Sequence, residues 1–274
     1  MFDLNNFVID RIVRGVALSQ KDDSVLFSIN QIQNASLNCA SESTDAVDAM
    51  GTPIATFYRA KSAEFSAENA LFDMNLMATQ LGTTKKVASN TSKITVPAME
   101  SFTVDATGKQ ALKHTPLTYT VVVDGVSKTV SSVKEIYALN GDSTFGTKYT
   151  CGSAASATQF AIAGKDITLP TGLAAGTEMF VMYEYESENA VEVVNSATNF
   201  PVGCKFVMEV LGCDVCDQTN LVYAYVIFNN AKLSPDFDWS IATDGTHPFS
   251  MKAQQDYCDK EKRLFSIIIP GDAE

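Results

Sequence analysis

The sequence has few of the residues, and none of the local motifs, from which common enzyme sites are built. Two histidines, His114 and His247, and one tryptophan occur among 274 residues. A Walker loop, a GxGxxG fingerprint after a strand, an HExxH helix and a calcium-loop pattern are all missing. These absences exclude the nucleotide, dinucleotide and zinc-protease sites that such motifs build. We therefore expect no enzyme, with no catalytic, cofactor-binding or metal-binding residue and no cofactor.

Positive charge and long apolar runs are also scarce. Lys and Arg number 20 against 32 Asp and Glu, which gives a formal net charge of −12 at pH 7. Tight binding of nucleic acid requires cationic side chains that neutralise phosphates, so this charge disfavours it. No apolar run approaches the roughly 18 residues that suggest a membrane helix. The proportions of hydrophobic (46%) and charged (19%) residues are ordinary, so we expect a soluble globular protein with no membrane span.

The two histidines and one acidic pair lie in local sequences typical of turns and loops. A proline follows each histidine within two residues, which favours extended or turn backbone. No Ser or Cys lies in a nucleophile elbow, so we interpret both histidines as structural or surface residues. Asp236 and Asp238 flank Phe237 in a DxD pattern, which holds a divalent ion only if further oxygen ligands converge. We favour a loop in which Phe237 and Trp239 pack against a sheet.

The cysteines are the residues whose chemistry the sequence leaves open. There are six of them: Cys39, Cys151, Cys204, Cys213, Cys216 and Cys258. Cys213 and Cys216 form a CxxC at the end of a predicted strand, compatible with half of a zinc site, a redox pair or a turn disulfide. A second CxxC is missing, so four thiolate ligands would require Cys204 and Cys258 as well. We favour reduced structural thiols, with zinc and a disulfide as the alternatives.

Alternating apolar residues and dense turn signals predict strands along most of the chain. Residues 7–13, 25–29 and 204–213 alternate, each with one apolar face. Residues 220–230 are apolar on both faces, as expected for a central strand covered on both sides. Asp124-Gly125 between two β-branched runs is a strong hairpin signal. The pattern predicts a mainly β protein.

Residues 66–81 form the one predicted helix. Ser66 is assigned as its N-cap, Glu68 favours the positive end of the helix dipole, and Gly82 stands where a left-handed C′ residue belongs. Apolar residues recur at spacings of three and four: Ala67, Ala70, Leu71, Met74, Met77 and Ala78. We expect this helix to cover one face of a β scaffold, with its methionines and leucine in the core.

The composition divides the chain into two parts. Residues from about 92 to 190 are rich in Thr, Val, Ala and Gly, with many turn signals and no helical period. We predict that 96–186 is a β-rich insertion or peripheral subdomain. Residues 1–95 and 187–274 then form an antiparallel β-sandwich or small barrel with the flanking helix.

Acidic residues cluster in two places. Residues 38–52 contain Glu42, Asp45 and Asp48 with no basic residue, which predicts an exposed loop or hairpin tip. Residues 178–193 contain five glutamates and no Lys or Arg, which indicates a solvated strand at the edge of a sheet.

The order of these parts resembles the tail tube (major tail) proteins of tailed bacteriophages. The resemblance rests on three stretches: "IATFYRAKSAEFSAENALFDMNLMATQLGT", "YEYESENAVEVVNSATNFP" and "NNAKLSPDFDWSIATDGTHPFSMKAQQDYCDKEKRLFSIIIP". It implies a β-sandwich or barrel with one helix, in subunits that form stacked rings of six around a hollow conduit for genome ejection. It also implies contacts with sheath, tail terminator or baseplate proteins, a place in the virion tail, assembly in the host cytoplasm and no catalytic residue.

The negative charge fits a conduit that passes DNA without binding it. An acidic wall repels phosphate over about a Debye length, roughly 10 Å at 0.1 M salt. The acids at 42–48 and 184–192 are the candidates for this lining. Two alternatives stay open: a virion decoration or adhesin-like protein whose 95–187 segment recognises a partner, and an enzyme that uses the CxxC or DxD.

Overall fold

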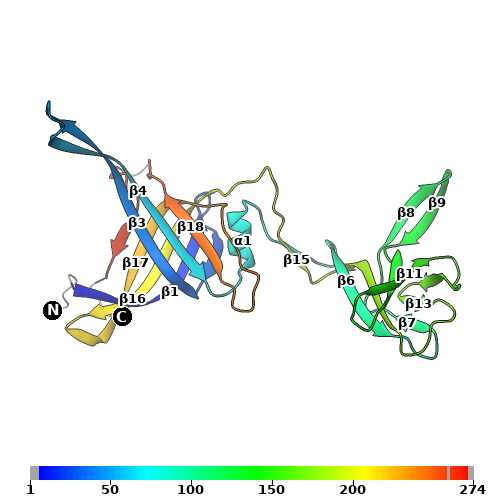
Figure 1. Ribbon diagram of the computed structural model, residues 1–274. Helices are drawn as coiled ribbons and strands as arrows, with labels where there is room; N and C mark the ends of the chain where they lie inside the picture. Colours follow the sequence, from blue (N-terminus) through cyan, green and yellow to red (C-terminus); the bar gives the residue numbers. More distant parts are fainter. Residues whose placement is uncertain (1–5, 258–259, 271–274) are drawn as a thin grey trace. The chain divides into compact units, whose positions relative to one another are not determined.

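The computed structural model describes residues 6–257 and 260–270, and it confirms a mainly β protein. Strands contain 56% of the residues and helix 3%. Contacts divide the chain into two compact units (Figure 1). Unit 1 is Met1–Lys85 with Val193–Glu274, and unit 2 is Lys86–Glu192. Unit 2 begins ten residues before the predicted start at 96 and ends six residues after the predicted end at 186, and independent folding of the two parts stays a prediction.

Unit 1 is built on one curled antiparallel sheet in the order β2-β1-β16-β17-β18-β4-β3, with β19 also paired to β17. Its strands are β1 (Phe7–Ser19), β2 (Val25–Ile29), β3 (Ile32–Val47), β4 (Pro53–Asn69), β16 (Gly203–Asp214), β17 (Asp217–Leu233), β18 (His247–Ala253) and β19 (Ser266–Ile268). Five phenylalanines fill its core with neighbouring ring centroids 5.8–6.4 Å apart: Phe27, Phe65, Phe206, Phe228 and Phe249.

The predicted helix begins eight residues too early. Ser66 lies in β4, and α1 spans only Met74–Gln80. The physical reason is the buried face of the strand: Ala63, Phe65, Ala67 and Asn69 alternate strictly with more exposed residues. This period of two places Phe65 and Ala67 in the core, whereas a helix would turn them away from one another. The helical spacing of three and four was therefore the wrong period over 66–73.

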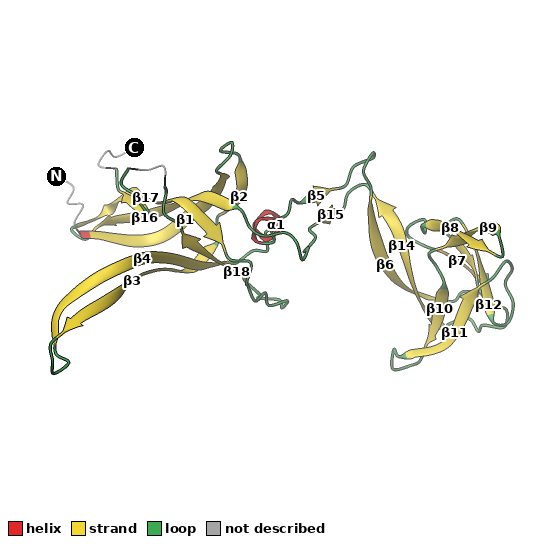
Figure 2. Ribbon diagram, turned by 90° about the horizontal axis from the view of Figure 1, so that it is seen from above, coloured by secondary structure: helices red, strands yellow, loops and turns green. Residues whose placement is uncertain are grey.

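The helix has the two end signals that a short helix needs. Asp73 is its N-cap, and its carboxylate accepts hydrogen bonds from the backbone N–H groups of Asn75 (2.9 Å) and Leu76 (2.7 Å). At the other end Gly82 has a φ of +65°, as predicted. The N–H of Gly82 donates to the Thr79 carbonyl and that of Thr83 to the Ala78 carbonyl, which is a Schellman motif. The helix packs beside β2 (Figure 2).

Unit 2 has its own sheet and its own core. The sheet order is β6-β14-β10-β11-β12-β13-β7, in which only β11 and β12 pair in parallel. Its strands are β6 (Ile94–Thr103), β7 (Lys109–Ala111), β10 (Glu135–Leu139), β11 (Phe145–Cys151), β12 (Gln159–Ala163), β13 (Asp166–Thr168) and β14 (Glu178–Ser187). Fully buried side chains such as Ile136, Phe160 and Met179 fill the interior.

Two short pairs complete unit 2. They are β5 (Lys86–Val87) with β15 (Val191–Glu192), and β8 (Thr118–Val123) with β9 (Val126–Ser131). Asp124 and Gly125 turn between β8 and β9 with φ values of 53° and 77°, so the predicted hairpin is confirmed. The interpretation of 178–193 as a sheet edge is wrong for Met179–Val181, which pair with β6 on one side and β10 on the other, whereas the ladder from Met182 to Ser187 is with β6 alone.

Candidate assembly surfaces

Unit 1 carries a two-stranded arm that consists of residues 38–62. Every residue of the arm is exposed. The arm is exposed because β18 pairs with β4 only from Asn69 to Glu64. Beyond Glu64, β3 and β4 pair only with one another. Figures 1 and 2 show the two strands leaving the sheet together. The prediction of an exposed hairpin tip at 38–52 is thus confirmed, with the turn at 48–52.

The arm presents large apolar side chains to solvent on both of its faces. Met50 is 91% exposed and Tyr58 72%, and Val47, Ile54 and Phe57 are exposed as well. Tyr58 stands opposite Ser43 and Phe57 opposite Thr44, so the two aromatic rings lie on opposite faces of the ribbon. A two-stranded hairpin without a core is at best marginally stable in water. Both faces of the arm are therefore candidate contact surfaces for another chain.

Three irregularities interrupt the pairing of β3 and β4. The register shifts between Gln33 and Ser36, between Ala40 and Glu42 and between Ala46 and Val47. Asn34 (φ 52°) and Ala60 (φ 49°) adopt left-handed backbone at the first two shifts. Bulges bend a strand pair and increase its twist, and a left-handed alanine is strained. The direction of the arm is thus fixed by backbone geometry that costs energy.

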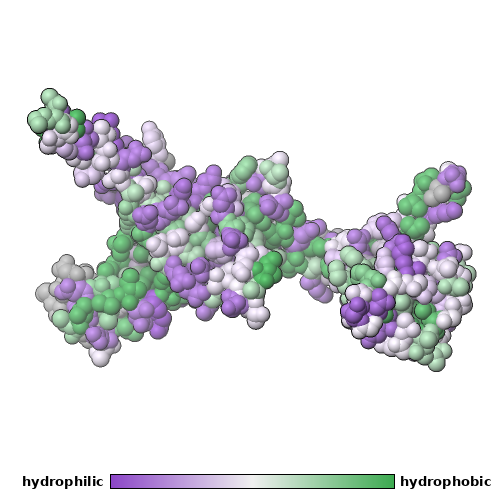
Figure 3. All heavy atoms as spheres, in the orientation of Figure 1, coloured by the Kyte–Doolittle hydropathy of each residue, from purple (hydrophilic) through white to green (hydrophobic). Residues whose placement is uncertain are grey.

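A second exposed apolar surface lies on the outer face of the unit 1 sheet. Val8, Cys213 and Leu221 are register partners on neighbouring strands and so share a face. Leu221 is 47% exposed, and Tyr223 and Ile268 are exposed on the same face. Figure 3 shows a hydrophobic patch over this part of unit 1. The expectation that 220–230 is covered on both sides is therefore wrong for the single chain, in which only the inner face meets a core.

The acidic residues of the arm are distributed between a turn and a strand. The Asp48 carboxylate accepts hydrogen bonds from the backbone N–H groups of Thr52 (2.9 Å) and Met50 (2.8 Å), which lower the pKa of Asp48. Asp48 thereby organises the tip. Glu42 stands opposite Arg59 across the ribbon. The arm is a mixed surface with an acidic tip.

Three of the four glutamates at 184–192 form ion pairs with two lysines that are distant in sequence, and the fourth, Glu184, accepts a hydrogen bond from the Tyr119 hydroxyl. Lys93 lies 3.2 Å from a Glu188 oxygen and 3.8 Å from a Glu186 oxygen, and Lys86 lies 3.8 Å from Glu192. Antiparallel pairing with residues 86–103 thus brings two lysines to four glutamates, and the segment keeps an excess of negative charge. Whether any of these acids lines a conduit stays a prediction.

His247 is a buried structural residue, and its partners explain why. One ring nitrogen, Nδ1, accepts from the Asp73 backbone N–H (3.5 Å), and Nε2 lies 2.8 Å from the Gln80 side-chain oxygen. The ring is fully buried and stacks on Phe72. Burial lowers the pKa of His247. The histidine therefore joins both ends of α1 to β18 as a neutral group.

The cysteines and the DxD pair form no ligand cluster in the described part of the chain. Five cysteines are free thiols, namely Cys39, Cys151, Cys204, Cys213 and Cys216, and Cys258 lies outside the described residues. Burial raises the pKa of Cys204 to about 11. Across residues 6–257 and 260–270, no three His, Cys, Asp or Glu residues are placed to share a metal. Trp239 stacks on Phe72 at 4.4 Å, and Phe237 packs near His247.

A β-rich chain with an exposed arm and an uncovered apolar sheet face has the surfaces of a structural protein that associates with further chains. The chain belongs to the YomU/Tube protein family, a phage tail tube family whose model matches residues 7–263, and this confirms the resemblance seen in the sequence. The family places the protein in the virion tail as a structural component. A search of curated proteins gave no match. In the described ranges no helix has the length and apolar character needed to cross a membrane.

Proposed function

We propose that copies of this chain form rings of six subunits that stack into the tail tube, through which DNA leaves the virion. The observation that carries this proposal is the arm, 25 consecutive exposed residues with apolar side chains on both faces. Exposed strand edges and apolar patches of this kind commonly form protein–protein interfaces. A neighbouring copy that covers Phe57 on one face and Tyr58 on the other would stabilise the arm.

The outer sheet face supplies a second contact. Leu221, Tyr223 and Ile268 form its apolar centre, and the Arg14–Glu209 ion pair (2.7 Å) lies on the same face. An apolar centre with a polar border is the anatomy of protein interfaces. The arm and the outer face are different surfaces, so contacts between them are heterologous and generate closed rings or extended stacks.

The charge of the chain supports the conduit. Unit 1 carries most of the excess of acidic over basic residues. A wall with few cations gives duplex DNA little to bind, because affinity for the backbone comes from neutralised phosphates. The acids at 42–48 remain the proposed contributors to such a lining, whereas those at 184–192 are weaker candidates because lysines pair with them. Sheath, tail terminator and baseplate proteins are the further partners we propose.

The test is negative-stain microscopy of the purified chain at increasing concentration. We expect rings and short tubes for the wild type, and end-on averages that show six subunits. The double variant F57S/Y58S should remain monomeric with an unchanged circular dichroism spectrum, since both side chains are exposed. Val122→Ser, which removes an equally exposed side chain from unit 2, is the matched control and should assemble normally. Monomers of the wild type at every concentration, or tubes of F57S/Y58S, would contradict the proposal.

A further inference from the structure

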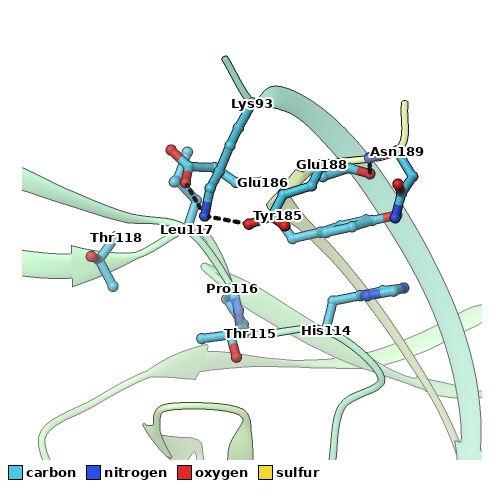
Figure 4. Close-up of a pocket in the computed structure, with 11 residues that line it drawn as sticks. Lys93, His114, Thr115, Pro116, Leu117, Thr118, Tyr185, Glu186, Glu188 and Asn189 are labelled. Carbon is cyan, nitrogen blue, oxygen red and sulfur yellow. Dashed lines mark hydrogen bonds and ion pairs between the residues drawn. The ribbon is translucent and has the colours of Figure 1, made fainter. Parts of the chain in front are cut away.

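Unit 2 contains a polar pocket that tail tube assembly does not explain. It has a volume of about 540 Å³ and lies between the end of β14 and residues 114–118, which lead into β8 (Figure 4). This volume is within the range of roughly 300–1,000 Å³ that small-molecule sites occupy. All of its lining residues belong to unit 2, so the pocket exists in the single chain.

One wall of the pocket is a pair of stacked rings. The imidazole of His114 lies parallel to the ring of Tyr185, with centroids 3.8 Å apart and 4° between the planes. The His114 backbone N–H donates to the hydroxyl of Tyr183, which holds this segment in place. His114 is exposed, while Tyr185 is half-buried beneath it. The stack is therefore a flat, fixed platform at the side of the pocket.

Most of the other lining residues carry groups that donate or accept hydrogen bonds. Lys93 bridges Glu188 and Glu186 at 3.2 and 3.8 Å, and Figure 4 shows its ammonium between the two carboxylates. Each carboxylate has about four acceptor positions, so one shared ammonium leaves most of them available. Thr118 adds a hydroxyl that donates and accepts, and Asn189 adds an amide that does the same.

The composition of the pocket lining favours some classes of ligand over others. Two carboxylates against one ammonium disfavour phosphates and other anions. Only Pro116 and Leu117 are apolar residues without a polar side-chain group, too few for a hydrophobic ligand. Among the described residues no three potential metal ligands converge. A neutral polyhydroxylated ligand fits, because its hydroxyls donate to carboxylates and accept from ammonium and amide groups while its C–H face lies on a ring.

We propose that this pocket binds a neutral saccharide, with His114 and Tyr185 as the platform and Lys93, Thr118, Glu186 and Glu188 as hydrogen-bonding partners. The proposal does not depend on ring formation, because none of these residues belongs to the arm or to the outer sheet face. It gives unit 2 a binding role separate from the structural role of unit 1.

The experiment is saturation-transfer NMR on the full chain with maltose, cellobiose, lactose and the anionic trisaccharide 6′-sialyllactose. We expect transfer to at least one neutral disaccharide with a dissociation constant of roughly 0.1–10 mM, a typical weak affinity. His114→Ala and Thr118→Val should each weaken binding about fivefold or more. Lys109→Ala, on β7 and outside the pocket, is the control and should bind like the wild type.

Three outcomes would overturn this assignment. They are no transfer to any of the three neutral disaccharides, binding by H114A and T118V equal to that of the wild type, and tighter binding of 6′-sialyllactose than of every neutral sugar. Thr118→Val is nearly isosteric and Thr118 is exposed, so we expect this variant to fold. It therefore tests the proposal even if H114A fails to fold. Saccharide binding by F57S/Y58S, which should not assemble, separates this proposal from the proposed tube.

Discussion

At the scale of single residues, two groups from outside α1 make a seven-residue helix stable. A helix this short is unstable by itself, so its ends and its buried face decide whether it forms. Asp73 satisfies two N–H groups at the start, and Gly82 closes the end. A side chain at Gly82 would also place its Cβ 2.2 Å from the Phe200 carbonyl oxygen, so the position excludes every residue but glycine.

Mutation can distinguish the N-cap in the structure, Asp73, from the N-cap predicted from the sequence, Ser66. Replacing Asp73 with Ala should lower the free energy of unfolding of unit 1 by about 1 kcal/mol, because two N–H groups lose their acceptor. Ser66→Ala should change it by less than about 0.5 kcal/mol, because Ser66 lies on the exposed side of a strand. Urea unfolding followed by tryptophan fluorescence measures both. Equal effects of the two substitutions would contradict the assignment.

His247 should make unit 1 sensitive to mild acid. Its pKa is lowered by burial from the ordinary 6.5, with Asp73 acting in the opposite direction. Below about pH 6.5 the unfolded chain binds a proton that the folded chain does not, so stability is complete above that pH and falls as the pH drops. The slope reaches at most about 1.4 kcal/mol per pH unit.

Urea midpoints at pH 7.5, 6.5 and 5.5 measure this dependence. The wild type should lose stability more steeply between pH 6.5 and 5.5 than His247→Gln, which has no group that titrates there. Parallel slopes for the two proteins would show that His247 is not the source. Carboxylates that titrate at lower pH contribute equally to both proteins and cancel in the comparison.

At the scale of elements, the long β4 strand contributes both to the unit 1 core and to the arm. From Ala63 to Asn69 it alternates buried and more exposed residues and is part of the unit 1 core. From residue 53 to 62 every side chain is exposed and the strand belongs to the arm. The strained Ala60 lies near the transition between the two parts. A core that holds one end of a strand can thus position the other end for a partner.

The arm should open easily in the single chain and become protected on assembly. Its hydrogen bonds are supported by no buried side chain, so local opening costs little. In hydrogen exchange we expect amides of residues 40–61 to exchange fast in the monomer and much more slowly in tubes, while those of β16 are slow in both. Slow exchange of the arm in the F57S/Y58S monomer would contradict this view.

At the scale of the whole molecule, one chain contains two cores that share no buried residue in the clusters described for units 1 and 2. We propose that residues 86–192 fold independently within a tail tube subunit. Under mild proteolysis with a nonspecific protease, cleavage near 83–85 and 193–202 should release a resistant fragment of about that length, identified by mass spectrometry. Simultaneous loss of both units would contradict independent folding.

The sequence predicted the parts of the fold that depend on local patterns. Asp124-Gly125 specified its hairpin because left-handed backbone at both positions suits these two residues. Alternation in 204–213 predicted a strand with one buried face, and the order of segments indicated the resemblance to the tail tube family, which the family match confirms. The strand at Ser66, which was wrongly predicted to be a helix, also has a local signal. The apolar residues Ala63, Phe65 and Ala67 recur at every second position in the sequence itself, as in a strand.

The candidate surfaces required three-dimensional information. Lys93 lies about ninety residues from Glu186, so only strand pairing shows that lysines pair with part of the glutamate-rich segment. His114 and Tyr185 are also distant in sequence, and they meet because residues 114–117 form hydrogen bonds with Tyr183 and Glu184 of β14. The composition of 38–52 predicted an exposed tip, but the exposure of residues 53–62 follows from where β18 ends, which depends on strand pairing.

By itself, the sequence determined the strands, the turns, the acidic charge and the absence of local catalytic motifs, because each of these depends on residues close together in the chain. Only the tertiary structure decided which apolar residues are covered and which charges are paired. Burial and ion pairing depend on contacts between distant segments, and here those contacts leave an arm and a sheet face without cover in the single chain.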